Sequence, residues 1–326
     1  MRIHAVRFAA LAGALTAAMM SVVQAQTVNW PDRPVKLIVP FPAGGPNDII
    51  GRVVGQKLQS LLGQPFVIDT RGGAGGVTGT DVVAKAAPDG YTIAITSAGA
   101  LAIAASIQKV PYHSTRDLAP VTLIASVPEL LVVPEALNVK SVAELVALAK
   151  ARPQGLNFAS TGRGSLPHLA AELYKVVTAS NMVHVPYSGA APAVQDLLAG
   201  RVDLLFADIT VLLEHVKAGK LRALGVGSKV RSPIMPDVPT FAEQGIPRVE
   251  AENWYGMVAT PGTPAAILGK LHAATLEALK SDEVRSKLLP LGATLSGNSS
   301  AEFAAYITAE SGKWADVVKK AGISVE

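Results

Sequence analysis

The feature that most constrains this chain is a regular alternation of two hydrophobic patterns along its length. The run Val35–Val39 is typical of a buried strand, and the apolar residues between positions 49 and 62 then recur at helical spacing. Strand Phe66–Asp69, helix Val77–Ala86 and strand Tyr91–Thr96 continue the series. This β-α-β-α-β order predicts a parallel sheet covered by helices.

A second series of the same kind begins beyond Pro128. Its predicted elements are helix Ser141–Ala151, strand Leu156–Ser160, helix Leu166–Val177, strand Met182–Pro186, helix Ala191–Ala199, strand Val202–Ala207, helix Thr210–Ala218 and strand Leu221–Val226. Three further helices are predicted at the end of the chain, over Pro264–Leu279, Asp282–Leu289 and Ala301–Ala321. The chain therefore contains two parallel α/β units.

Two apolar stretches predict how the units are joined. Ala119–Ala125 and Glu129–Val133, separated by Pro128, indicate a crossover into the second unit, and Trp254–Ala259 indicates the return. Two α/β units with two crossovers are typical of a two-lobed binding protein, in which hinge closure traps a ligand in the cleft between the lobes. The expected division is lobe one at 26–127 plus 256–326 and lobe two at 128–255.

The first 25 residues have the pattern of a secretory signal peptide. Arg2 and Arg7 precede the apolar run Phe8–Val23, and Val23-Gln24-Ala25 has the small-x-small form of a cleavage site. The run is shorter than the roughly 20 residues that a membrane span needs. We therefore expect removal of residues 1–25 and a location outside the cytoplasm. Cleavage lowers the formal net charge from +4 to +2, so no nucleic-acid partner is expected. Because the chain has no cysteine, disulfides, thiolate metal sites and cysteine catalysis are excluded.

The loops that follow the predicted strands share one composition: they are rich in Gly, Ser and Thr and poor in Lys and Arg. They are "PFPAGGPND" (40–48), "DTRGGAGGVTG" (69–79), "TSAGA" (96–100), "STGRGSLPH" (160–168), "PYSGAAP" (186–192) and "ADIT" (207–210). Ligands of open parallel sheets bind at these strand ends. Glycines let backbone N–H groups approach a ligand, and helix N-termini favour negative charge, so the loops predict an anion site.

Other interpretations of these loops remain open. Gly44 and Gly45 are also explained as turn residues, and Ser165 as a helix N-cap. Ser165 and His168 fit the nucleophile and base of an exported hydrolase, although no G-x-S-x-G elbow is present. "GGAGGVTG" (72–79) lacks the full dinucleotide fingerprint, and the histidines lack metal-ligand spacing. Neither a cofactor nor a metal is therefore expected.

Five segments together resemble a known family. They occur in family order and extend over essentially the whole chain beyond the signal peptide: "WPDRPVKLIVPFPAGGPND", "VVAKAAPDGYT", "DLAPVTLIAS", "VPYSGAAPAVQDLLAGRVDLLF" and "VPTFAEQG". This pattern is similar to the periplasmic solute-binding proteins of tripartite tricarboxylate transporters, the Bug family. The resemblance implies an α/β, two-lobed periplasmic binding protein type II fold, with parallel-rich sheets joined by two hinge strands. It also implies a monomer without catalytic activity that delivers a small carboxylate to a membrane permease.

The resemblance also implies the binding residues, because main-chain amides, hydroxyls and bridging waters hold the carboxylate in this family. In lobe one they are Phe41, Ala43, Gly44, Asp48 and Ser97. In lobe two they are Thr161, Gly162, Ser165, His168, Tyr187 and Asp208. We expect Asp48 to repel a second acidic group or to pair with a ligand amine. For Arg163 the alternatives are a second ligand carboxylate or solvent.

Two departures from the family pattern leave the ligand open. The loop 69–76 reads "DTRGGAGG" where the family usually has "NRPGAGG", and the segment after Ser97 lacks the frequent Asn-Pro. The expected ligand is therefore a mono-, di- or tricarboxylate, an aromatic acid or an acidic amino acid. A sensor subunit that presents its closed form to a membrane kinase is the alternative to transport.

Overall fold

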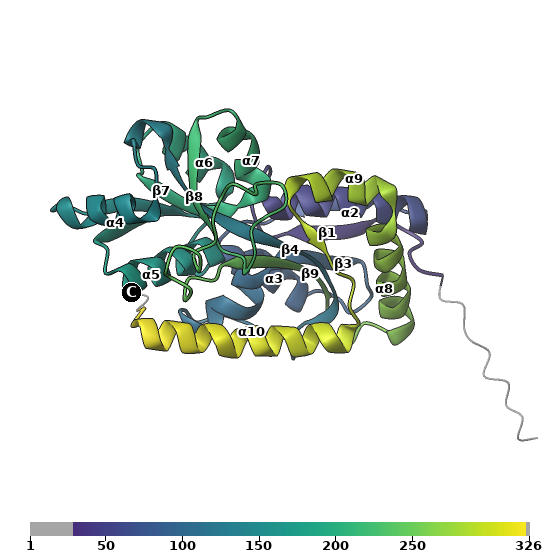
Figure 1. Cartoon of the computed structure of the whole chain (residues 1–326). Helices are drawn as coiled ribbons and strands as arrows, with labels where there is room; N and C mark the ends of the chain where they lie inside the picture. Colours follow the sequence, from purple (N-terminus) through teal and green to yellow (C-terminus); the bar gives the residue numbers. More distant parts are fainter. Residues whose placement is uncertain (1–28, 324–326) are drawn as a thin grey trace, which may run out of the picture. The chain divides into compact units, whose positions relative to one another are not determined.

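The structure is a computed structural model that describes residues 29–323, so the predicted signal peptide lies outside the described residues. The chain divides into two units, residues 1–30 and 31–326, and every element below belongs to the second. Within the described residues, ten strands form one mixed sheet with the main order β2-β1-β3-β9-β4-β7-β5-β6 (Figure 1). β10 and β8 also pair with β4.

The elements observed in the described residues follow the predicted alternation closely. The strands are β1 (Val35–Val39), β2 (Phe66–Thr70), β3 (Thr92–Ser97), β4 (Ala119–Pro134), β5 (Leu156–Ser160), β6 (Met182–Pro186), β7 (Leu204–Asp208), β8 (Leu221–Val226), β9 (Glu252–Ala259) and β10 (Thr294–Leu295). The helices are α2 (Pro46–Leu62), α3 (Val77–Ala84), α4 (Val142–Ala151), α5 (Leu166–Thr178), α6 (Ala190–Leu198), α7 (Ile209–Lys217), α8 (Ala265–Lys280), α9 (Asp282–Leu288) and α10 (Ser300–Ala321). Short helical turns occupy Ala74–Gly76, Gly99–Ile103, Ala104–Ser106, Glu135–Leu137 and Leu289–Leu291.

The sheet consists of two halves that share β4. The first half-sheet contains β1, β2, β3, β9, β10 and residues 119–128 of β4, and the second contains residues 129–134 of β4 with β5 to β8. β1 pairs in parallel with β2 and β3, and β5 pairs in parallel with β6 and β7. The strands β9, β7 and β8 run antiparallel to β4. The predicted parallel α/β units are therefore joined through antiparallel neighbours.

The strand β4 is continuous where the sequence suggested a break at Pro128. Pro128 lies opposite Glu252 of β9, and the next residue, Glu129, donates its N–H to the carbonyl of Ala251 at 3.0 Å. Because successive N–H groups of a strand point to opposite sides, proline at 128 costs no hydrogen bond to β9. The outgoing and returning connections between the half-sheets are therefore adjacent strands. The predicted lobe boundary at 255/256 falls within β9, and the division into two lobes stays a prediction.

Local sequence explains where the longest helices begin and end. Pro46 occupies the first turn of α2, where its missing N–H costs nothing. The helix ends at Gly63, whose φ of 74° lets its N–H bond the carbonyl of Gln59. α10 begins with a capping box in which Ser299 and Glu302 satisfy each other's backbone donors.

Two hydrophobic clusters support the sheet. One lies in the second half-sheet and packs α4 and α5 against it, with Phe158, Tyr174 and Phe206 fully buried. The other extends from the first half-sheet through Trp254 to α10 and also includes Leu166 and Leu169 of α5. α10 therefore packs against elements of both halves, and it runs along one side of the sheet towards α5 (Figure 1).

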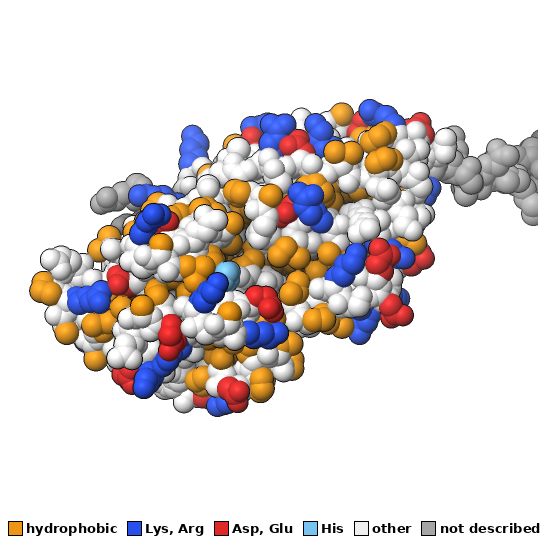
Figure 2. Space-filling view, turned by 90° about the horizontal axis from the view of Figure 1, so that it is seen from above, with side chains coloured by type: hydrophobic (Ala, Val, Ile, Leu, Met, Phe, Trp, Pro, Cys, Tyr) orange, Lys and Arg blue, Asp and Glu red, His pale blue; other side chains and the backbone are white. Residues whose placement is uncertain are grey.

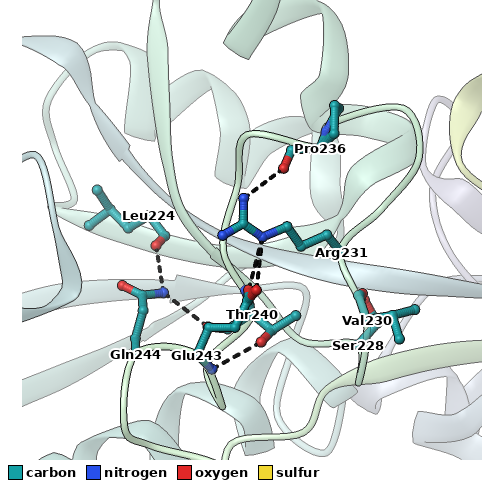
Figure 3. A network of polar contacts seen from close by, with 8 residues as sticks. All are labelled: Leu224, Ser228, Val230, Arg231, Pro236, Thr240, Glu243 and Gln244. Carbon is teal, nitrogen blue, oxygen red and sulfur yellow. Dashed lines mark hydrogen bonds and ion pairs between the residues drawn. The ribbon is translucent and has the colours of Figure 1, made fainter.

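A polar network organises the long connection from β8 to β9 (Figure 3). Arg231 pairs with Glu243 at 3.0 Å, and Thr240 and Glu243 exchange hydrogen bonds of 2.7 and 3.1 Å. Gln244 donates from Nε2 to the carbonyl of Leu224 at 3.0 Å, which ties the connection to β8. The "VPTFAEQG" segment, 238–245, therefore has a structural role in fixing the return to β9.

Basic and acidic side chains are interspersed on the face seen in Figure 2. Ion pairs such as Arg33 with Asp89 and Lys85 with Asp81 connect many of the surface charges. No helix within residues 29–323 has both the length and the hydropathy that a membrane span requires.

Candidate functional site

A cavity lies where the predicted strand-end loops of the two half-sheets meet. Its volume is about 30 Å³. It is lined by Phe41, Gly45, Pro46, Asn47, Ser97, Thr161, Ser165, Leu166, Pro167, Ala190, Ala207, Asp208, Asn253 and Tyr255. None of these described lining residues is a lysine or an arginine, so any anion bound there is held by neutral donors.

Four helices begin at this cavity, and two of them have glycine as the N-cap. α2 starts after Gly45 and α6 after Gly189, and neither glycine has a side chain that could accept the first N–H groups. α5 starts after Ser165 and α7 after Asp208. Since the first N–H groups of a helix lack intrahelical acceptors and carry partial positive charge, this convergence favours an anion.

The first turn, Pro40–Asp48, connects β1 to α2. Phe41 and the start of α2 face the cavity, whereas Ala43 and Gly44 are exposed and do not line it. Asp48 is buried but faces its own turn: Oδ2 accepts from the N–H of Gly44 at 3.0 Å and Oδ1 pairs with Arg52 at 2.8 Å. Its neighbour Asn47 lines the cavity and donates from Nδ2 to the carbonyl of Ile95 at 3.2 Å.

The second turn, Ser160–His168, connects β5 to α5 and is held by its own hydrogen bonds. Ser165 Oγ donates to the carbonyl of Gly162 at 2.7 Å and accepts from the N–H of His168 at 3.4 Å, as an N-cap does. Gly162 has φ +124° and donates to Ser160 Oγ at 3.1 Å. Thr161 and Ser165 line the cavity, and Gly162 does not.

His168 lies one turn into α5, and its ring contacts His184 and Gly164. Its ring stacks on that of His184 with centroids 4.1 Å apart, and Nδ1 accepts from the N–H of Gly164 at 3.4 Å. Burial lowers the pKa of His168 to about 4 and that of His184 to about 3. The hydroxyl of Ser165 accepts from the backbone N–H of His168 and donates its own proton to the carbonyl of Gly162.

Three buried polar residues close the cavity at β7 and β9. Asn253 Nδ2 donates to Asp208 Oδ1 at 3.1 Å, and the hydroxyl of Tyr255 donates to Asp208 Oδ2. Asn253 Nδ2 also donates to Tyr255 Oη at 2.8 Å. Burial raises the pKa of Asp208 to about 7 and holds that of Tyr255 well above its usual value. Tyr187, by contrast, does not line the cavity, and its hydroxyl donates to Asp196 at 2.8 Å.

Five of the binding residues expected from sequence line this cavity. Phe41, Ser97, Thr161, Ser165 and Asp208 were predicted and line the cavity. Asn253 and Tyr255 were missed because β9 runs antiparallel, so the rule that ligands gather at the carboxyl ends of parallel strands does not reach them. A signal was available: two polar groups alternate in an otherwise apolar strand, "ENWYGMVA".

Metal binding finds no support in the side chains. Within residues 29–323, no three His, Cys, Asp or Glu residues are grouped so that they could hold a metal ion.

Comparisons with known proteins agree with this architecture. The model of the tripartite tricarboxylate transporter family receptors matches residues 50–323. Protein BugT of Bordetella pertussis is 40% identical over 313 residues, which cover 95% of each chain.

Two solved structures are similar over almost the whole fold. Rpa4515 of R. palustris with adipate has a TM-score of 0.88 and 37% identity, and the match covers 91% of this chain and all of the other. MatC of Rhodopseudomonas palustris with bound malate has a TM-score of 0.86 and 33% identity, and the match covers 89% of this chain and all of the other.

Proposed function

The chain belongs to the tripartite tricarboxylate transporter receptor family, and from this premise we propose that it captures a small carboxylate in the periplasm and delivers it to a membrane permease. The α/β periplasmic binding protein fold and the Bug-family resemblance are both confirmed by these matches. The family consists of solute-binding receptors and not of enzymes, which agrees with a binding role.

The observation that carries the proposal is the convergence of α2, α5, α6 and α7 on one cavity without lysine or arginine. Backbone N–H groups and the hydroxyls of Ser97 and Thr161 are the available donors. Such donors suit a carboxylate, which accepts several hydrogen bonds at once. Malate and adipate, which the two similar structures contain, are carboxylates of this kind.

The size of the cavity indicates that ligand entry requires movement. About 30 Å³ holds roughly one or two waters, far less than a dicarboxylate occupies. We propose that the two half-sheets rotate apart about a hinge formed by the adjacent strands β4 and β9. The ligand enters the opened cavity, and the half-sheets then close around it. Small-angle scattering with and without ligand measures this change.

A thermal-shift screen tests the proposal directly. A carboxylate at 100 times its Kd adds about 2.7 kcal/mol to the free energy of unfolding, which corresponds to roughly 5 °C in the Tm of a chain this long. The screen pairs each acid with its neutral diamide, for example adipate with adipamide, so that shape and charge are separated. Equal shifts for acid and amide, or no shift for any acid, would contradict carboxylate binding.

Delivery to a permease is tested separately from ligand binding. The proposal predicts that the processed chain is recovered in the periplasmic fraction and that a pull-down with adipate present captures permease subunits. Capture of a membrane kinase instead would favour the sensor role. The geometry gives the hydrolase alternative no comparable support, because Ser165 Oγ is occupied as an N-cap.

A further inference from the structure

A fully buried glutamate lies where β4 passes from one half-sheet to the other. Glu129 has none of its surface exposed, and within residues 29–323 neither of its carboxylate oxygens has a hydrogen-bond partner. An ionised carboxylate without partners is strongly disfavoured in a protein interior, so this group is expected to hold a proton. The proposed function assigns Glu129 no role.

Glu129 lies directly opposite Asp208, the acidic residue of the cavity. The two residues are cross-strand partners in the antiparallel pairing of β4 with β7. Side chains at such positions have Cβ atoms about 5 Å apart. With Asn253 and Tyr255, whose donors fix the carboxylate of Asp208, they form what we call the acid cluster. Within the acid cluster, Asp208, Asn253 and Tyr255 line the cavity, and Glu129 does not.

The surroundings of the acid cluster supply no compensating positive charge. Neither Glu129 nor Asp208 has an ion pair with lysine or arginine in the described part of the chain. Burial and the charge of Asp208 hold the pKa of Glu129 well above its usual value, and burial raises the pKa of Asp208 to about 7.

Tyr255, His168 and His184 keep one protonation state around neutral pH. On β9, Tyr255 stays protonated because burial raises its pKa, and Glu252 is exposed at the strand's start. On α5 and β6, His168 and His184 are neutral, since their pKa values are lowered to about 4 and 3. The pair Glu129 and Asp208 therefore dominates proton binding at this site between pH 6.5 and 8.5.

We propose that the acid cluster couples carboxylate binding to the uptake of a proton, with protonated Asp208 donating a hydrogen bond to the bound anion. This inference rests on the proposed function, because it requires a ligand carboxylate in the cavity. No covalent bond of the ligand changes: one proton moves from solvent to the Asp208–Glu129 pair as the anion enters. Without that proton, the ligand would face a like charge in a site that excludes water.

The sign of the pH dependence follows from linkage. Affinity is fully present while Asp208 is protonated in the free protein and falls as pH rises through about 7. With that value, the association constant should fall about 25-fold between pH 6.5 and 8.5. Proton uptake should be about 0.25 per ligand at pH 6.5 and about 1 at pH 8.5.

Calorimetry of the full exported chain tests the coupling. Adipate and malate are titrated separately at both pH values, each in two amine buffers of different ionisation enthalpy, because the difference in heat between buffers reveals proton uptake. Asp208→Asn is expected to abolish the pH dependence and the proton uptake, because the amide cannot titrate. Glu129→Gln should reduce both. Asp203→Asn, the same change at the residue before β7, should leave both intact.

The outcomes separate this inference from the proposed function. Binding of either acid with constant affinity and no proton uptake would overturn the coupling alone. Affinity that rises with pH would also overturn it, because binding would then be linked to the release of a proton and not to its uptake. Failure of both acids to bind at either pH would count against the proposed carboxylate function itself. Calorimetry of the wild-type chain at the two pH values tests the coupling even if a variant does not fold.

Discussion

The first turn and the second turn place different residues at the same two positions of the helices that follow them. In α2 the N-cap is Gly45 and the third residue is Asp48; in α5 these positions are Ser165 and His168. Ser165 caps its own helix, whereas Gly45 has no side chain with which to do so. Asp48 instead secures the turn from within by accepting from Gly44.

This difference in capping decides which backbone N–H groups remain available to a ligand. A turn that satisfies its own donors is rigid and contributes shape, while a helix start without a side-chain cap leaves N–H groups that an anion can occupy. By this argument α2, α6 and α7, none of which has a side-chain cap bond, supply the anion-binding donors. In α2 the candidate donor is the N–H of Asn47, because Pro46 has none and the N–H of Asp48 donates to the carbonyl of Gly45. The second turn holds Thr161 and the N-cap hydroxyl of Ser165 in place beside them.

The largest expected effect concerns the buried histidine of the second turn. The lowered pKa of His168 means that the unfolded chain, with a pKa near 6.5, takes up a proton that the folded chain refuses. The contribution of neutral His168 to the free energy of unfolding is therefore fully present above pH 6.5. Roughly 3 kcal/mol of it is lost as pH falls towards 4.

Chemical denaturation of wild type and His168→Gln across pH 7 to 4 isolates this effect. The comparison with the variant is needed because Asp208 acts in the opposite direction: its raised pKa removes stability as pH rises towards 7. The free energy of unfolding of the wild type should fall relative to the variant as pH decreases. A constant difference would show that His168 titrates normally.

The next effect tests the contact between the halves at the second turn. Gly75 has φ +65°, and a Cβ there would lie 2.5 Å from the carbonyl oxygen of Arg163. Gly75→Ala should therefore disfavour the closed arrangement and weaken adipate binding by about 10- to 100-fold. Gly63→Ala is the matched control, because its φ is similar at +74° but no atom lies within 4 Å. Equal affinities for the two variants, measured by calorimetry, would contradict closure at this contact.

A third variant makes the first turn resemble the second. Gly45→Ser introduces a side chain that can cap α2, and it should raise the free energy of unfolding by a few tenths of a kcal/mol. Because the new hydroxyl competes with the ligand for the same donors, adipate affinity should fall about tenfold. Gly45→Ala adds a similar volume without an acceptor and should change affinity much less. Equal losses in both variants would point to steric effects alone.

The smallest effect concerns Asp48. Asp48→Asn removes the ion pair with Arg52, whose side chain is 55% exposed, so the expected loss of stability is about 0.5 kcal/mol. Arg52→Gln removes the same pair but keeps the bond from Gly44, and should cost slightly less. Ligand affinities of Asp48→Asn for mono- and dicarboxylates test the prediction that Asp48 selects among acids. Unchanged affinity for every acid would remove that role.

The fold was largely predictable because it depends on short-range patterns. Apolar runs and helical spacing located nearly all strands and helices, and Gly, Pro and Ser marked where helices begin. The continuity of β4 through Pro128 was missed, since the pairing partner that makes proline harmless there is distant in sequence. The two-residue strand β10 was missed for the same reason.

Local composition was enough to predict that strand-end loops rich in glycine and hydroxyls would gather at one site with few basic residues. Which members of each loop reach the cavity depends on the three-dimensional packing: Asn47 and not Asp48, and Thr161 and not Gly162. It also placed Glu129 opposite Asp208 and brought the hydroxyl of Tyr255 to the carboxylate of Asp208. These choices depend on strand register and helix rotation, which long-range packing sets and no local pattern records.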